Sequence, residues 1–173
     1  PQKIADGEGT DDRPIVSPNG QWVYFARFTG NLSTIMKVPS LGGESVRVTS
    51  QGNYGLLGIS PDGKLLAVRR YNENAPVAWQ TGLINAETGE AVRMFDERIY
   101  GRIGFSADGK SIIYTEAKNF RNLWQLALDN TDPQLLTNFE SGNIRNFDIS
   151  ADGRTIALSH GSPSLEAVLV NGF

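Results

Sequence analysis

Cysteine is absent from this chain of 173 residues, which excludes a disulfide framework and thiolate metal sites but does not decide the compartment. No apolar run approaches the roughly 20 residues that a membrane-spanning helix needs, so we expect no membrane insertion. The net charge of -3 comes from interspersed acidic and basic residues rather than from a block of one sign. This balance gives no electrostatic footprint for nucleic acid, and we expect no nucleic-acid partner.

Helix signals and catalytic motifs are also lacking. No segment keeps the i, i+3, i+4, i+7 apolar pattern for three turns, which indicates an all-β protein. The hydrolase motifs G-x-S-x-G and H-E-x-x-H do not occur. Ser159 and the single histidine, His160, are neighbours on an expected strand and would point to opposite faces, so they cannot act as nucleophile and base. We expect no enzymatic activity, no catalytic residue, no cofactor and no bound metal.

One short turn sequence recurs four times, every 43 to 46 residues. Its copies are SPNG, SPDG, SADG and SADG, beginning at Ser17, Ser60, Ser106 and Ser150. Asp-Gly or Asn-Gly between two apolar runs is a strong hairpin signal, because the turn needs positive φ angles. A repeat of this period is typical of propeller and solenoid arrays.

The strand that follows each turn is a nearly continuous apolar run: WVYFAR, LLAVRR, SIIYTE and TIALSH. Such a strand is covered on both faces of its sheet. Further strand candidates follow in each repeat, so that one repeat predicts a four-stranded antiparallel sheet. Sheets that are apolar on both faces pack radially into a β-propeller, whose sheets are called blades. We predict one propeller unit over 1–173, with blades at about 7–50, 51–96, 97–139 and 140–173, the last completed by 1–6.

The strand QKIAD, residues 2–6, aligns with the fourth strands of the repeats but has no repeat before it. The last repeat offers only the run EAVLVNGF, residues 166–173, after its second strand and lacks a fourth one. Residues 2–6 can therefore complete the last blade of the same chain or of a neighbour. We predict a homodimer joined through blade edges, in which two chains form an eight-bladed ring; the alternative is a four-bladed ring closed by one chain.

Several short segments of the repeats resemble those of a known propeller family. The Ser-Pro-Asp-Gly turn, the apolar strand after it, the run NLWQL and the closing Thr of VRVTS and LLTNF resemble TolB-like and tricorn-protease-like propeller repeats, which are relatives of WD repeats. Two turns carry Ala in place of Pro, one carries Asn in place of Asp, and the WD dipeptide is missing. The C-terminal segment is similar to the end of bacterial TolB-like propellers attached to kinases or winged-helix regulators. The resemblance implies an accessory, sensory or protein-binding domain in a periplasmic or extracytoplasmic location.

Arginine and tyrosine residues gather at the expected start of the innermost strands. Aligning the repeats at their serines places Arg13 and Arg102 near the propeller axis, with Asp12 and further residues in the connecting loops. The candidate ligand-binding residues are Arg13, Tyr54, Tyr100, Arg102 and Arg145. Guanidinium groups at this rim would suit an anionic peptide or a carboxylate. The alternative is that these arginines only pair with Asp12, Asp148 or Glu140.

Other polar residues have structural interpretations. The turn residues Asn19, Asp62, Asp108 and Asp152 are expected to cap the turn backbone. The acidic stretch DGEGTDD lacks the spacing of a calcium loop, and we expect a solvated loop. We also expect the tryptophans Trp22, Trp79 and Trp124 to fill the core between blades rather than to form a ligand cage.

Three functions remain open from the sequence. The first is a non-enzymatic protein-binding or peptide-binding, or sensory, propeller module that forms part of a larger bacterial protein. The second is a propeller accessory domain that gates the catalytic domain of a peptidase or kinase. The third is an engineered half-propeller that assembles without a ligand.

Overall fold

The computed structural model describes residues 2–75, 78–95, 99–116, 118–129, 131–150 and 152–162, and for Tyr100 it describes only the backbone. Among these residues, each of the first three repeats forms a four-stranded sheet, and the described part of the fourth forms a two-stranded sheet. The strands are β1 (Thr10–Val16), β2 (Trp22–Thr29), β3 (Leu32–Pro39), β4 (Val46–Arg47), β5 (Tyr54–Ile59), β6 (Leu65–Tyr71), β7 (Trp79–Asn85), β8 (Ala91–Met94), β9 (Ile99–Phe105), β10 (Ser111–Glu116), β11 (Leu123–Ala127), β12 (Gln134–Leu135), β13 (Asn143–Ile149) and β14 (Ile156–Gly161). Within the described ranges no helix is long and apolar enough to cross a membrane.

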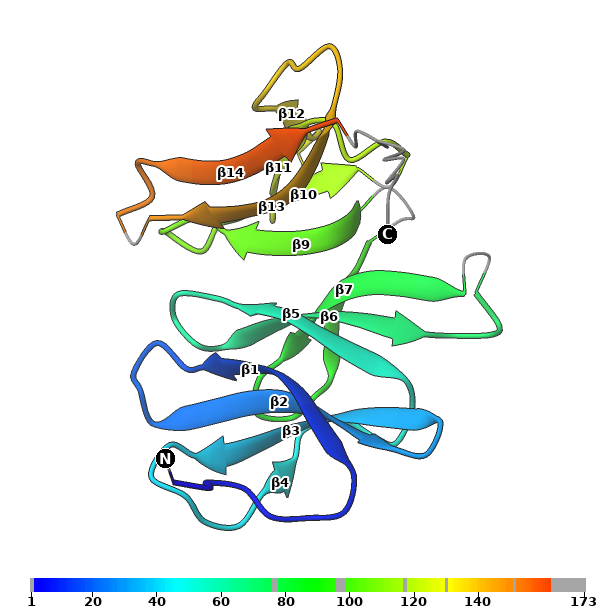
Figure 1. The fold of residues 1–173 in the computed structure, drawn as a ribbon, viewed down its shortest axis with the longest axis vertical. Helices are drawn as coiled ribbons and strands as arrows, with labels where there is room; N and C mark the ends of the chain where they lie inside the picture. Colours follow the sequence, from blue (N-terminus) through cyan, green and yellow to red (C-terminus); the bar gives the residue numbers. More distant parts are fainter. Residues whose placement is uncertain are drawn as a thin grey trace, which may run out of the picture.

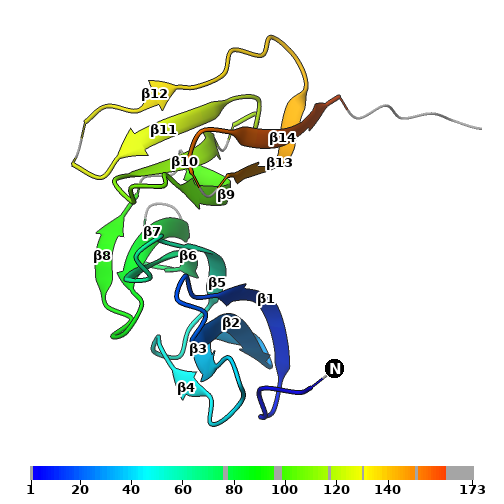
Figure 2. The same cartoon turned by 90° about the vertical axis from the view of Figure 1, so that its left-hand side faces the viewer.

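The sheets follow one another in chain order and form an arc (Figure 1). Every pairing within a sheet is antiparallel, and the first strand of each repeat lies at one edge of its sheet. β5 contacts both β1 and β9, and β9 contacts β13, so the first strands form the inner side of the arc. The turned view shows β4, β8 and β12 on the opposite side (Figure 2). This arrangement confirms the prediction of an all-β, propeller-like fold.

The recurring turn has the same hydrogen bonds in all four copies. In the second copy the Ser60 hydroxyl donates to Asp62 Oδ1 at 2.6 Å and accepts from the Leu65 N–H at 2.9 Å, while the Lys64 N–H donates to Asp62 Oδ1 at 3.0 Å. The final glycine of each copy has a φ between 69° and 73°, a region in which a residue with a Cβ is strained. The predicted hairpins and the capping role of the turn side chains are thus confirmed.

The core consists of layers between successive sheets. The central strands β2, β6 and β10 bury side chains on both faces, as their continuous apolar sequences predict. Tyr24 and Ala26 face the second sheet, Ala67 faces the third, and Ile113 faces the fourth. Because each layer draws on two repeats, burial of apolar surface couples neighbouring repeats.

Residues 2–6 differ from the prediction in two ways. They form no strand, and Ile4 and Ala5 pack against Val23, Phe25 and Val38 of the first sheet. The N-terminus and the β13–β14 sheet lie at opposite ends of the arc (Figure 1), so within one chain these residues do not complete the last blade. The apolar side chains of Ile4 and Ala5 are instead partly buried against the apolar outer face of the first sheet. The run at 166–173, expected to be a third strand of the last blade, lies outside the described residues.

Candidate functional site

In each sheet, the register between the first strand and the second strand shifts at one place, which we call a break. The breaks lie between Asp12 and Ile15 in β1, between Leu56 and Gly58 in β5, opposite Tyr114 and Thr115 in β9, and between Ile144 and Asn146 in β13. The residues that these breaks insert include three of the predicted ligand-binding arginines: Arg13, Arg102 and Arg145. A β-bulge redirects a side chain away from the regular alternation, and bulges are common beside binding sites.

Arg13 has an unusual backbone conformation at the first bulge. Its φ is 53°, in the left-handed region, although it carries a Cβ. Its N–H donates to Asp12 Oδ1 at 2.8 Å, which helps to hold this conformation. Such a residue stores about 1–3 kcal/mol of backbone strain, and strained residues cluster at binding sites.

Three predicted residues line a single cavity of about 770 Å³ between the first and second sheets. Arg13 comes from β1, Tyr54 from the start of β5 and Arg102 from β9. Apolar side chains, among them Ile15 and Leu56, form part of the wall. Pockets for small ligands or peptide side chains are of this size and combine apolar walls with a few polar groups. We call this cavity the arginine pocket.

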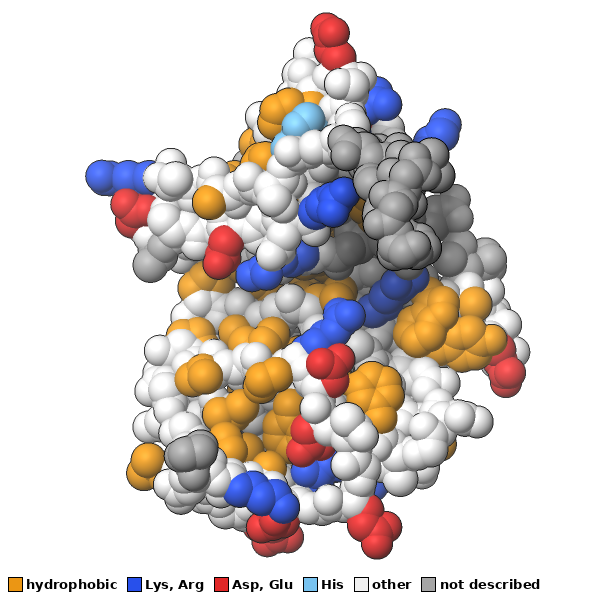
Figure 3. All heavy atoms as spheres, in the orientation of Figure 1, with side chains coloured by type: hydrophobic (Ala, Val, Ile, Leu, Met, Phe, Trp, Pro, Cys, Tyr) orange, Lys and Arg blue, Asp and Glu red, His pale blue; other side chains and the backbone are white. Residues whose placement is uncertain are grey.

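Figure 3 shows hydrophobic side chains gathered over the lower two sheets and a band of Lys and Arg side chains across the middle of the same face. Trp79 also lines the arginine pocket, with 43% of its surface exposed. Its ring contacts Tyr71 edge-on at 5.5 Å between centroids, and the Arg69 guanidinium lies 5.2 Å from its centre. An exposed aromatic ring beside cationic groups offers stacking as well as charge.

The prediction that all three tryptophans fill the core is wrong for Trp79. Trp22 and Trp124 are partly buried and pack against the clusters between sheets. Trp79 is the first residue of β7 and pairs with Tyr71 at the loop end of the β6–β7 hairpin. No local sequence signal separates Trp79 from Trp22 and Trp124, because all three lie on strands of similar apolar pattern.

The expected ion pairs of the arginines are present but weak. Arg13 Nε lies 3.5 Å from an Asp12 carboxylate oxygen, and Arg102 Nη2 lies 3.5 Å from Asp148 Oδ1. Arg102 also donates to Asn146 Oδ1 at 3.2 Å. Each charged partner is largely exposed, and long, exposed ion pairs contribute little to stability. A stronger anionic ligand can therefore replace them at small cost.

The remaining two predicted residues do not join this group. Arg145 is exposed on β13 and lines neither the arginine pocket nor the smaller cavity of about 290 Å³ beside Arg102. The side chain of Tyr100 lies outside the described residues. The structure thus brings together Arg13, Tyr54 and Arg102.

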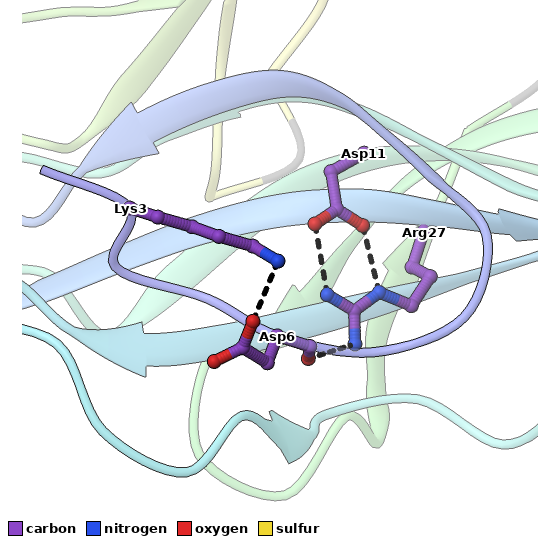
Figure 4. A network of polar contacts seen from close by, with 4 residues as sticks. All are labelled: Lys3, Asp6, Asp11 and Arg27. Carbon is purple, nitrogen blue, oxygen red and sulfur yellow. Dashed lines mark hydrogen bonds and ion pairs between the residues drawn. The ribbon is translucent and has the colours of Figure 1, made fainter. Parts of the chain in front are cut away.

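Carboxylates in the acidic stretch have separate cationic partners (Figure 4). Asp6 pairs with Lys3 at 2.5 Å, and Asp11 accepts two hydrogen bonds from Arg27, at 2.7 and 2.8 Å. The hydrogen bond from Lys3 lowers the pKa of Asp6, and the bond to Asp11 raises the pKa of Arg27. The described residues contain no group of three or more acidic, His or Cys side chains placed to hold a metal ion.

His160 has a structural environment. It stacks on Phe139 with 4.1 Å between ring centroids, and its Nε2 lies 2.9 Å from the Ser141 carbonyl oxygen. His160 and Ser159 pair with different residues of β13 on a regular strand, so their side chains point to opposite faces.

Comparisons with solved structures identify the architecture. A protein assigned as TolB from Agrobacterium tumefaciens superposes with a TM-score of 0.76 at 20% identity, over 94% of this chain and 59% of that protein. TolB from Acinetobacter baumannii gives 0.72 at 21% identity, over 89% of this chain and 38% of that protein. A structure of prolyl endopeptidases gives 0.63 at 14% identity, over 87% of this chain and 26% of the other.

No family model matches the sequence, and no curated protein matches it. The chain spans about three fifths of the first TolB structure and less than half of the second. At these identities the likeness concerns the fold, and it agrees with the resemblance carried by the repeated turns. The chain has the β-propeller fold of the TolB proteins.

Proposed function

We propose that this chain is a non-enzymatic interaction module that binds an anionic group of a protein or peptide in the arginine pocket. The observation that carries the proposal is the convergence of Arg13, Arg102 and Tyr54 on one cavity, although the two arginines are far apart in the sequence. Propeller rims carry recognition because their loops and strand ends vary on a rigid scaffold.

The chemistry of the pocket favours a carboxylate beside an apolar or aromatic side chain. Guanidinium groups bind carboxylates through paired charge-assisted hydrogen bonds, and both Arg13 and Arg102 are more than 45% exposed. Trp79 and Phe28 add exposed ring surface beside them. Acidic peptides with a neighbouring apolar residue combine both features.

The test begins with a phage-displayed library of random linear peptides, selected on the immobilised chain and measured by calorimetry as synthetic peptides. We expect Asp or Glu to be enriched next to apolar residues. The Arg13→Ala/Arg102→Ala variant should bind the best peptide about tenfold to a hundredfold more weakly, because charge-assisted hydrogen bonds contribute about 1.5–3 kcal/mol.

The matched control is Arg154→Ala, which removes an exposed arginine that lines neither cavity. This variant should bind the peptide like the unaltered chain. Selected peptides without acidic residues, or equal binding by the double variant, would contradict the proposal.

A second candidate function is the accessory propeller of a peptidase or kinase, which controls access to a catalytic domain. The similarity to the prolyl endopeptidases and to an acylaminoacyl peptidase, with a TM-score of 0.56 for the latter, favours the peptidase form. Sequencing the complete gene distinguishes the two candidates, because this function requires an adjacent catalytic domain. An extracytoplasmic location is part of the first proposal, and cell fractionation tests it.

A further inference from the structure

Three joints connect the four sheets, and each uses the same contact between successive turns. A Cβ atom added to Gly63 would lie 3.5 Å from Pro18, and one added to Gly109 would lie 3.7 Å from Pro61. At the third joint a Cβ on Gly153 would lie 2.8 Å from Ala107 Cβ. The second residue of each turn therefore packs on the last residue of the next turn.

On the first sheet, no neighbouring turn among the described residues packs on the equivalent glycine, Gly20. An added Cβ on Gly20, the equivalent glycine, meets nothing within 4 Å. Val16 pairs with Val23 on the same outer face and is 57% exposed, whereas its equivalent Ile59 packs in the layer between the first two sheets. The inner part of this face is thus apolar and uncovered.

Residues 2–6 already occupy the outer part of the same face. Ile4 lies beside Gly42 of the β3–β4 connection, in the way that Val48 lies beside Gly89 of the β7–β8 connection. Val48 belongs to the segment that contributes the fourth strand of the preceding sheet. The segment 2–6 therefore takes the place of the fourth strand of a sheet that docks on β1–β4.

The opposite end of the arc has the complementary face. The residues equivalent to Ala157 are Tyr24, Ala67 and Ile113, which face the next sheet and are at most 6% exposed. Ala157 itself is exposed, as is Ser159 on the same face. This end of the arc therefore presents the face that the other three sheets bury, and no described sheet packs on it.

We propose that a second copy of this chain docks the outer face of its β13–β14 sheet on the outer face of the β1–β4 sheet. The partner's last turn then packs on Gly20, and residues 2–6 lie along the outer part of this joint. The contact repeats the three joints seen within the chain. Because each copy offers one face of each kind, two such contacts related by a two-fold axis close a ring of eight sheets from two sets of four.

The experiment measures the mass of the chain by light scattering after size exclusion over a wide concentration range. We expect twice 18.9 kDa for the unaltered chain. Val16→Arg and Ala157→Arg should each give 18.9 kDa, because an arginine on either face blocks docking while both positions are exposed in the single chain. The matched control is Val92→Arg on β8, which is also 57% exposed and should keep the doubled mass.

Circular dichroism melts of the variants show whether each one still folds. A mass of 18.9 kDa for the unaltered chain at every concentration would overturn the proposal and mean that another segment or protein covers these faces. A doubled mass for either arginine variant would also overturn it. A ladder of larger masses would exclude closure by two copies.

Discussion

The contact between successive turns predicts a difference between two otherwise similar substitutions, Gly153→Ala and Gly63→Ala. Both glycines end the same turn, with φ angles of 70° and 73°. An added methyl group at Gly63 would meet Pro18 at 3.5 Å, which is ordinary van der Waals distance. The same group at Gly153 would meet Ala107 Cβ at 2.8 Å, so part of the backbone must move.

The expected free energies follow from these geometries. Alanine in the left-handed region costs about 1–2 kcal/mol at either position. Gly153→Ala should lower the free energy of unfolding by a further amount of about 1–3 kcal/mol through overpacking, because Ala107 Cβ is fixed to the backbone and cannot rotate away. Each kcal/mol lowers the melting temperature of a domain of this size by about 2–4 °C.

Urea unfolding at equilibrium measures the difference, and Ala107→Gly provides the control. In the Ala107→Gly/Gly153→Ala variant the overpacking is removed, so the two substitutions should couple favourably by about 1–3 kcal/mol. Equal losses of stability for Gly63→Ala and Gly153→Ala, or no coupling in the double variant, would refute the contact between turns.

Two further predictions concern charged groups. Hydrogen bonds from serine hydroxyls lower the pKa of the three turn aspartates in the folded state, so their stabilisation is present above the ordinary aspartate pKa of about 3.9 and is lost as the pH falls below it. Replacing all three by Asn, as the first turn already has, should flatten the pH dependence of the unfolding free energy below about pH 4, as acid titration by circular dichroism can show. Lys37 is buried, and its ammonium lies 2.7 Å from Glu87 in the β7–β8 connection and 4.8 Å from the Trp22 ring. Glu87→Gln, which leaves the lysine charge without its carboxylate, should destabilise the chain by about 1–3 kcal/mol and more than Lys37→Met does, as measured by urea unfolding.

The sequence predicted the local parts of the fold because their determinants lie within a few residues. In each turn a serine, an Asp or Asn and a glycine make the recurring hydrogen bonds of the turn within six residues. The continuous apolar runs of the central strands predicted burial on both faces, and the repeat period predicted successive sheets. The placement of Arg13, Tyr54 and Arg102 near the inner rim followed from aligning the repeats.

Other features depended on contacts between distant repeats. The sequence did not show that bulges in β1 and β9 direct Arg13 and Arg102 into one cavity, or that Arg145 lies apart from it. Trp79 could not be separated from the buried tryptophans, because its exposure depends on how far the β6–β7 hairpin extends past its neighbours.

The sequence by itself determined the turns, the strands and their repetition, since hydrogen bonds and apolar patterns over short distances fix them. Only the tertiary structure decided where residues 2–6 lie, which face of each end sheet is open, and which arginines meet. These features depend on the packing of whole sheets, in which the apolar area buried between repeats decides among positions that the local sequence leaves equally possible.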